Sequence, residues 1–79
     1  MKRPNPTRIG EKVRAVRRKL GLSQSQLALR INPDMYYGRI SDYELGKRIP
    51  NLLTLLDYAR LAGIHVEDLI DDDVELNLF

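Results

Sequence analysis

The chain is divided into short segments by residues that begin or end helices, and this division limits its fold more than any other feature. Within residues 8–20, apolar side chains recur every three or four residues, which is the period of an amphipathic helix. Glycines follow three of the apolar segments, where a chain commonly leaves a helix in a left-handed conformation: Gly21, Gly46 and Gly63. The sequence therefore predicts an all-α fold of five short helices.

Capping residues set the expected starts of these helices. Ser23, with Gln26 three residues later, forms the pattern of a capping box. Asp34 and Asn51 are suitable N-caps for two later helices, and Pro33 ends the helix before Asp34 because proline disfavours helical geometry in the preceding residue. We expect helices over residues 8–20, 24–31, 35–45, 52–62 and 65–70.

The apolar stripes of these helices predict the core. We expect the following side chains to be buried: Ile9, Val13, Val16, Leu20, Leu27, Ala28, Ile31, Leu52, Leu55, Leu56, Ala59 and Ala62. In the helix over residues 35–45, the expected buried stripe is centred on Ile40, with Tyr36, Tyr43 and Glu44 beside it. The opposite stripe is expected to face outward: Met35, Gly38, Arg39, Ser41, Asp42 and Leu45, with Tyr37 at the border.

The last residues of the chain have a different period. Residues 74–79 alternate apolar and polar side chains, which is typical of a short strand rather than a helix. Such a strand needs a pairing partner, for example its copy in a second chain. A frayed tail after the acidic run 71–73 is an equally good interpretation, and the sequence leaves both open.

The charges are segregated along the chain. Residues 1–50 contain twelve Lys and Arg against four acidic residues, whereas residues 51–79 contain one arginine against seven acidic residues. A basic half of this kind indicates a polyanionic partner such as nucleic acid. We divide the chain into a basic N-terminal arm (1–7), a helical domain (8–70) and an acidic, strand-like C-terminal tail (71–79).

Composition argues against several classes of protein. With 79 residues and no cysteine, the chain has room for one core and no disulfide to support it. No apolar run approaches the roughly 20 residues that cross a bilayer, and the basic start lacks the apolar segment of a signal peptide. We therefore expect a soluble cytoplasmic protein without a membrane partner. The single histidine, His65, and an acidic run without calcium-loop spacing indicate neither an enzyme nor a metal or cofactor site.

An ordered set of residues resembles the Cro/C1-type (Xre-like) helix-turn-helix family. The set comprises Gly21-Leu22-Ser23-Gln24, Leu27-Ala28, Ile40-Ser41, Glu44, Gly46-Lys47-Arg48 and Pro50. The resemblance covers about residues 9–70 and implies a five-helix, lambda-repressor-like domain whose second and third helices form the DNA-binding unit. Members are mostly transcriptional regulators, commonly dimers on palindromic operators. This chain has two residues more than the commonest pattern between Leu27 and Ile40, around residues 32–34.

The resemblance implies roles for particular residues. Ser23, Gln24, Lys47 and Arg48 match positions that contact the DNA backbone, although Gln24 is also explained as a capping partner. Tyr37, Gly38, Arg39, Ser41 and Asp42 occupy or neighbour the base-contacting positions. Arg17 and Glu44 match a partly buried ion pair that joins the first helix to the third.

Two of the base-contacting positions have alternative explanations. Arg39 is suited to bidentate pairing with guanine, whereas Asp42 either accepts from a cytosine amino group or pairs with Arg39 at i, i+3. Gly38 costs a helix roughly 1 kcal/mol relative to alanine, so it is either tolerated or allows the backbone to approach DNA closely.

The leading hypothesis from the sequence is a sequence-specific double-stranded DNA-binding regulator, a repressor by family likeness. It is expected to form a homodimer on a palindromic operator, with residues 71–79 as a candidate dimer contact. The alternative is an antitoxin or another protein-interaction module that uses the same fold and binds a partner such as a toxin through its tail.

Overall fold

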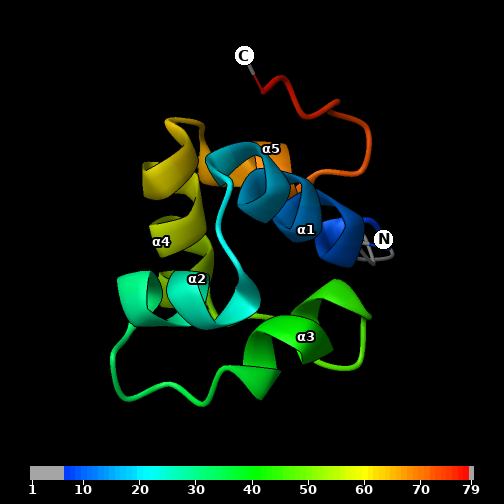
Figure 1. Ribbon diagram of the computed structural model, residues 1–79. Coiled ribbons are helices and arrows are strands. Elements are labelled where there is room, and N and C mark those ends of the chain that lie inside the picture. The colour runs from blue at the N-terminus through cyan, green and yellow to red at the C-terminus, as the bar shows by residue number, and fades with distance from the viewer. Residues whose placement is uncertain (1–6, 79) are drawn as a thin grey trace.

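A computed structural model describes residues 7–78 of the chain, and these residues form five helices without a strand. The helices are α1 (Ile9–Leu20), α2 (Gln24–Ile31), α3 (Gly38–Glu44), α4 (Leu52–Ala62) and α5 (Val66–Ile70). Helix α1 contacts α3, α4 and α5, while α2 contacts α3 and α4. Figure 1 shows α3 at one end of the molecule and the C-terminal tail at the other. The predicted five-helix fold is confirmed, and residues 1–6 of the predicted basic arm lie outside the described residues.

Local capping places four of the helices within a residue of their predicted bounds. The Ser23 Oγ accepts from the Gln26 N–H at 3.1 Å, and the Gln26 Oε1 accepts from the Ser23 N–H at 2.8 Å, which completes the capping box of α2. The Asn51 Oδ1 accepts from the Thr54 N–H at 2.9 Å and caps α4. The three glycines predicted to end helices all have positive φ: Gly21, Gly46 and Gly63.

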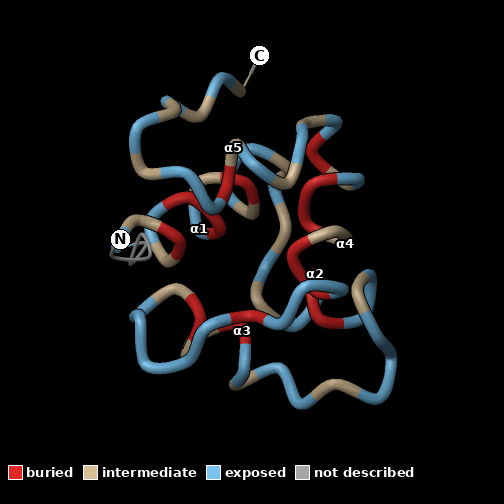
Figure 2. Tube along the Cα trace, turned by 180° about the vertical axis from the view of Figure 1, so that it is seen from behind, coloured by how far each residue is buried: buried red, intermediate tan, exposed pale blue. Residues whose placement is uncertain are grey.

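The core lies between the five helices and is mostly the predicted one (Figure 2). Its buried apolar residues are Ile9, Val13, Val16, Leu27, Ala28, Ile40, Tyr43, Leu55, Tyr58, Ala59, Ala62 and Leu69. Leu20 and Ile31 are half-buried against this cluster, as is Leu22, the residue before the α2 cap. Leu52 was expected inside and is 69% exposed, because the inward stripe of α4 begins at Thr54 and Leu55.

The start of α3 differs from the prediction by one turn. The helix begins at Gly38 rather than Met35, and Asp34 is not its cap. The Asp34 N–H donates to the Asn32 Oδ1 at 3.0 Å, and the Met35 N–H donates to the Asn32 carbonyl at 2.9 Å. These bonds close a turn over residues 32–35, so Asp34 belongs to a turn and cannot cap the helix.

Two side chains before α3 lie opposite to their expected sides. Tyr36 was expected beside the core and is 68% exposed, whereas Met35 was expected outside and packs against the core. Helical spacing gave the wrong side for both because these residues precede the helix. The prediction for Ile40 and Tyr43, which lie inside α3, is correct.

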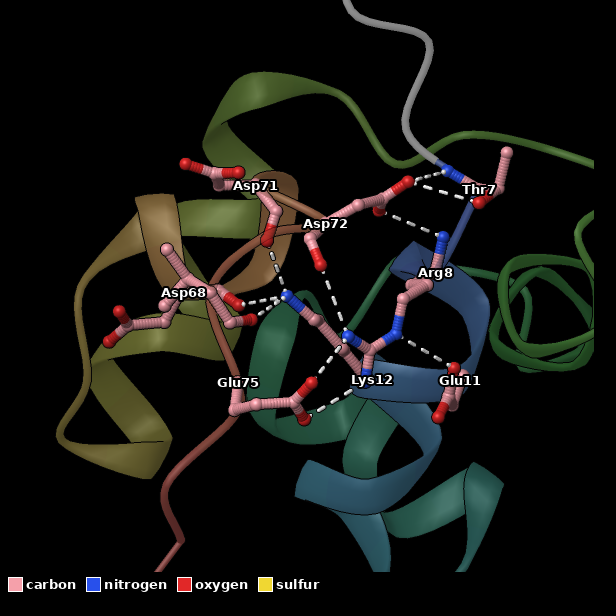
Figure 3. Close-up of polar contacts among 9 residues, drawn as sticks. Thr7, Arg8, Glu11, Lys12, Asp68, Asp71, Asp72 and Glu75 are labelled. Carbon is pink, nitrogen blue, oxygen red and sulfur yellow. Dashed lines mark hydrogen bonds and ion pairs between the residues drawn. The ribbon is translucent and has the colours of Figure 1, made fainter.

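Lys12 joins α1 to the end of α5 and to the tail. Its side chain is 1% exposed, and its Nζ donates to three backbone carbonyls: Asp68 at 2.8 Å, Asp71 at 2.7 Å and Val74 at 2.7 Å (Figure 3). The ammonium thus uses its three donors on carbonyls of α5 and of the chain that follows it. We call Lys12 and these three carbonyls the lysine clamp.

A second group of contacts fixes the tail to the start of α1. The Asp72 carboxylate accepts from the Thr7 N–H at 2.8 Å and from the Arg8 N–H at 3.1 Å. Arg8 also donates to both carboxylate oxygens of Glu75, at 3.1 and 3.3 Å. The Thr7 backbone N–H is the main cause that lowers the pKa of Asp72, and the hydrogen bond from Arg8 lowers the pKa of Glu75.

The tail is extended but is not a strand within the described residues. Its apolar members Leu76 and Leu78 are half-buried against the core, while the intervening residues are exposed. The alternating pattern therefore arises from an extended segment laid against the helices of its own chain. At its start, the carbonyls of residues 71, 72 and 74 accept hydrogen bonds from Lys12 and Arg8.

Candidate nucleic-acid interface

An ion pair holds α3 against α1. The Arg17 Nε donates to the Glu44 Oε2 at 2.6 Å, and Arg17 Nη2 donates to Oε1 at 3.0 Å, so the pair is bidentate. The Glu44 side chain is 4% exposed and that of Arg17 is 16% exposed. The hydrogen bond to Glu44 is the main cause that raises the pKa of the Arg17 guanidinium. Arg17 Nη1 also donates to the Leu22 carbonyl at 3.0 Å, which connects the pair to the turn before α2.

Gly10 allows α1 to approach the end of α3 closely enough for this pair. A Cβ at position 10 would lie 2.8 Å from the carbonyl oxygens of both Tyr43 and Glu44. These are backbone atoms within a packed crossing, so a larger residue would force the helices apart. Because Gly10 has no side chain, α1 can pack directly against the last turn of α3 and hold that helix in place.

Gln24 lies at the same junction. Its Nε2 donates to the Glu44 Oε1 at 3.4 Å, so the predicted phosphate-contacting glutamine touches the ion pair. Ser23, the other predicted phosphate contact on α2, uses its hydroxyl to cap the helix. Glu44 therefore links α1, α2 and α3 at one point.

The outward side of α3 and the loop after it present most of the predicted DNA-contacting residues together. We call this surface the α3 face, and it comprises Tyr37, Gly38, Arg39, Ser41, Asp42, Lys47 and Arg48. Tyr37, Arg39, Lys47 and Arg48 are exposed, and the other three are half-buried. Arg39 and Asp42 form no ion pair within the described residues, so the i, i+3 pairing is absent and the guanidinium is free to bind a ligand.

The loop that carries the two cations is fixed by its backbone. The Lys47 N–H donates to the Asp42 carbonyl at 2.9 Å, and the Arg48 N–H donates to the same carbonyl at 3.3 Å. Gly46 supplies the required positive φ of 77°. The positions of Lys47 and Arg48 relative to α3 are thus set by the C-terminal turn of the helix, while their side chains remain exposed.

Tyr58 is the one buried side chain of the described residues whose polar atom has no hydrogen-bond partner. Its side chain is fully buried, and burial is the main cause that raises its pKa, with Glu44 as a second cause. The phenol therefore stays neutral beside the ion pair and gives the site no additional charge.

The C-terminal end of the described chain lies far from α3. Figures 1 and 2 both show the C-terminal end of the described tail and α3 at opposite ends of the molecule. The start of the tail lies closer to the α3 face, because Asp72 accepts from Thr7, and Thr7 lines a small pocket together with Arg48. Among residues 7–78 there is no cluster of side chains suited to hold a metal ion. No helix of the described chain has the length and apolar character needed to cross a membrane.

The interface involves residues that the sequence pattern did not indicate. Gly10 carries no local signal, because its role depends on a crossing with residues far along the chain. Tyr36 was assigned to the core but stands exposed next to the α3 face. It lies two residues before the helix and directly after a proline-containing turn, and this turn was the available sign that helical spacing did not apply to it.

Comparison with known proteins places these features in a family. The sequence matches the Helix-turn-helix family over residues 13–69. A crystal structure of the P22 c2 repressor in complex with the synthetic operator 9T matches with a TM-score of 0.71 and 27% identity, covering 80% of this chain and 92% of that chain. The solution structure of the DNA-binding domain of the P22 c2 repressor (1-76) matches with a TM-score of 0.73 and 26% identity, covering 95% and 97%. No curated protein matches the sequence.

Proposed function

The chain belongs to the Cro/C1-type helix-turn-helix family, and on that premise we propose that it is a sequence-specific regulator of transcription that binds double-stranded DNA and acts as a repressor. One observation carries the proposal. The α3 face presents the unpaired Arg39 on the helix and Lys47 and Arg48 in the loop directly after it. The operator complex of the P22 c2 repressor, which shares the fold, supports the same assignment.

We place α3 in the major groove, where the N-terminal residues of such a helix contact base edges. Arg39 would pair with guanine O6 and N7, and Tyr37, Gly38, Ser41 and Asp42 would lie along the same bases. Lys47, Arg48 and the start of α2 at Ser23 and Gln24 would contact phosphates. The Arg17–Glu44 pair would fix the position of α3 relative to α1 and α2, and thereby the base contacts relative to the phosphate contacts.

A test of this proposal is selection of bound duplexes from a random pool, followed by titration against salt. Lys47, Arg48 and their dimer mates would neutralise about four phosphates, so log affinity should fall with log salt at a slope of roughly −4. Arg39→Ala should reduce discrimination at the base pair that it contacts in each half-site by about 1–3 kcal/mol. Lys47→Ala should weaken all duplexes alike and, because the dimer loses two cations, reduce the magnitude of the slope by about 2.

Arg60→Ala is the matched control for these variants. Arg60 is an exposed cation on α4 in the acidic half of the chain, so its loss removes the same charge outside the α3 face. Its affinity and salt slope should stay close to those of the wild type. A selection without enrichment, or binding that does not respond to salt, would contradict the proposal.

We also propose that the regulator binds as a homodimer, through residues 45–53 rather than through the tail. The start of the tail is already bound within its own chain, because Asp71, Asp72 and Val74 accept hydrogen bonds from Thr7 or Lys12. By contrast, four large apolar side chains of residues 45–53 are 62–70% exposed: Leu45, Ile49, Leu52 and Leu53. They flank Lys47 and Arg48, so a second copy seated here would stand next to the DNA backbone. Half-sites would then lie about 10 base pairs apart, or a multiple of that.

Replacing one of these leucines tests the dimer contact. Leu53→Ser should weaken binding to a two-half-site operator about tenfold and leave binding to an isolated half-site unchanged, because only the apolar contact between copies is lost. Leu29→Ser, at a leucine of α2 that is 64% exposed, should change neither. Equal binding of the Leu53 variant and the wild type to the full operator would place the dimer contact elsewhere.

The antitoxin alternative depends on a partner for the tail. Because Leu76 and Leu78 pack against the chain's own core, such a partner would meet mainly the exposed polar residues Asp71, Asp73, Glu75 and Asn77. Within the described part of the tail, residues 71–78, no apolar strand face is left for it. We therefore favour the regulator.

A further inference from the structure

Two tyrosines stand exposed immediately before α3. Tyr36 is 68% exposed and Tyr37 is 53% exposed, and their ring centroids lie 5.1 Å apart with a tilt of 49°. Tilted aromatic pairs at this separation attract each other, so each ring limits the motion of the other. A solvated pair of aromatic rings next to the α3 face has no role in the core.

Gly38 makes room for one of these rings. A Cβ at position 38 would lie 2.9 Å from Cζ and 3.0 Å from Cδ2 of Tyr36, and closer still to Cε2. The ring of Tyr36 therefore occupies the space that a side chain at the first position of α3 would take. The backbone does not require glycine here, because Gly38 is not among the residues with positive φ.

We propose that Tyr36 is a specificity-determining residue that uses the space left by Gly38 to present its ring to a thymine methyl group. The inference rests on the proposed function, in which the start of α3 meets base edges. The C5-methyl of thymine is the apolar group of the major groove, and an aromatic ring is a suitable contact for it. The ring thus supplies, from outside the helix, the contact surface that Gly38 lacks.

The turn over residues 32–35 explains why Tyr36 reaches this position. It ends the preceding segment with Met35 held against the core, and α3 starts only at Gly38. The Arg39 N–H donates to the Tyr36 carbonyl at 3.0 Å, which attaches the Tyr36 backbone to the first turn of α3. The tyrosine is therefore positioned by both its backbone and its ring.

The experiment uses duplexes in which each thymine of the selected site is replaced in turn by deoxyuridine, which lacks only the methyl group. Wild-type protein should bind one such duplex about fourfold more weakly, the effect of one buried methyl group. Tyr36→Ala should lose this discrimination, and Tyr36→Phe should keep it because the ring is retained. Thermal melting of each variant checks that the fold is intact.

A double-mutant cycle with Gly38→Ala separates the two explanations of the glycine. If Gly38 exists to seat the ring, Gly38→Ala should abolish the methyl discrimination in the wild type and cause no further loss of affinity in Tyr36→Ala. If Gly38 instead lets the backbone approach DNA, Gly38→Ala should weaken binding equally in both backgrounds, and the seating of Tyr36 would be overturned.

Other outcomes are also decisive. Methyl discrimination that persists in Tyr36→Ala, or that no thymine shows in the wild type, overturns the inference while leaving the proposed function in place. A Tyr36→Phe variant that weakens all duplexes alike assigns the residue to a phosphate contact through its hydroxyl and overturns the base contact. Absence of any selected duplex for the wild type is the separate failure of the proposed function.

Discussion

Glu44→Ala is expected to destabilise the fold by roughly 3–5 kcal/mol, because it leaves the nearly buried Arg17 guanidinium without its counter-ion. A chain of this length has a total stability of about 4–12 kcal/mol, so the variant should be partly unfolded at room temperature or melt at least about 12 °C lower. Thermal and urea unfolding followed by circular dichroism measure the effect. DNA affinity should fall because folded protein is lost.

Two further variants identify the cause. Glu67→Ala removes an exposed carboxylate from α5 and should change the melting temperature by only a few degrees. The double variant Arg17→Met/Glu44→Met removes both charges and should recover much of the loss, because no unpaired charge is then buried. Glu44→Ala melting like the wild type would contradict the role assigned to the pair.

Lys12→Met is expected to lower stability by roughly 3–5 kcal/mol, since it leaves three carbonyls of the lysine clamp without their charged donor. Methionine preserves the length of the side chain, so the loss reports the hydrogen bonds rather than a cavity. Urea unfolding gives the change in free energy. Hydrogen exchange at residues 71–76 should report release of the tail before global unfolding.

Arg18→Met is the matched control, because Arg18 is an exposed cation on the same helix. Its unfolding should resemble that of the wild type. A Lys12→Met variant with wild-type stability and a protected tail would show that the clamp does not hold the tail. A deletion of residues 71–79 would not test partner binding alone, because it would also remove two of the three carbonyls to which Lys12 donates.

Lowering the pH should weaken the contacts between the tail and the start of α1, independently of the lysine clamp. Asp72 and Glu75 both have a lowered pKa in the folded chain, so their contacts stabilise the fold above the ordinary carboxyl pKa range. This contribution is lost as the pH falls through the folded pKa values and the carboxylates become protonated. In the lysine clamp, Lys12 donates to backbone carbonyls, which do not become protonated in this pH range. The clamp therefore does not weaken as the carboxylates are protonated.

Much of the candidate interface could be predicted because it lies inside regular helix. The positions of Ile40 and Tyr43 follow from the spacing within α3, and the exposed side of the helix then follows for Arg39. Residues 32–37 could not be placed in this way. They form a turn with no repeating period, so the side of Tyr36 depends on the turn closed by Asn32 and on the space above Gly38.

The sequence by itself determined the number of helices, the starts and ends of four of them, and most of the core. Capping and apolar periodicity act between residues three or four positions apart, so both can be recognised from the sequence alone. Only the tertiary structure decided that Lys12 is buried, that the tail lies on α1 and that Gln24 touches Glu44. These contacts join residues 20 to 67 positions apart, and such contacts depend on how the helices pack.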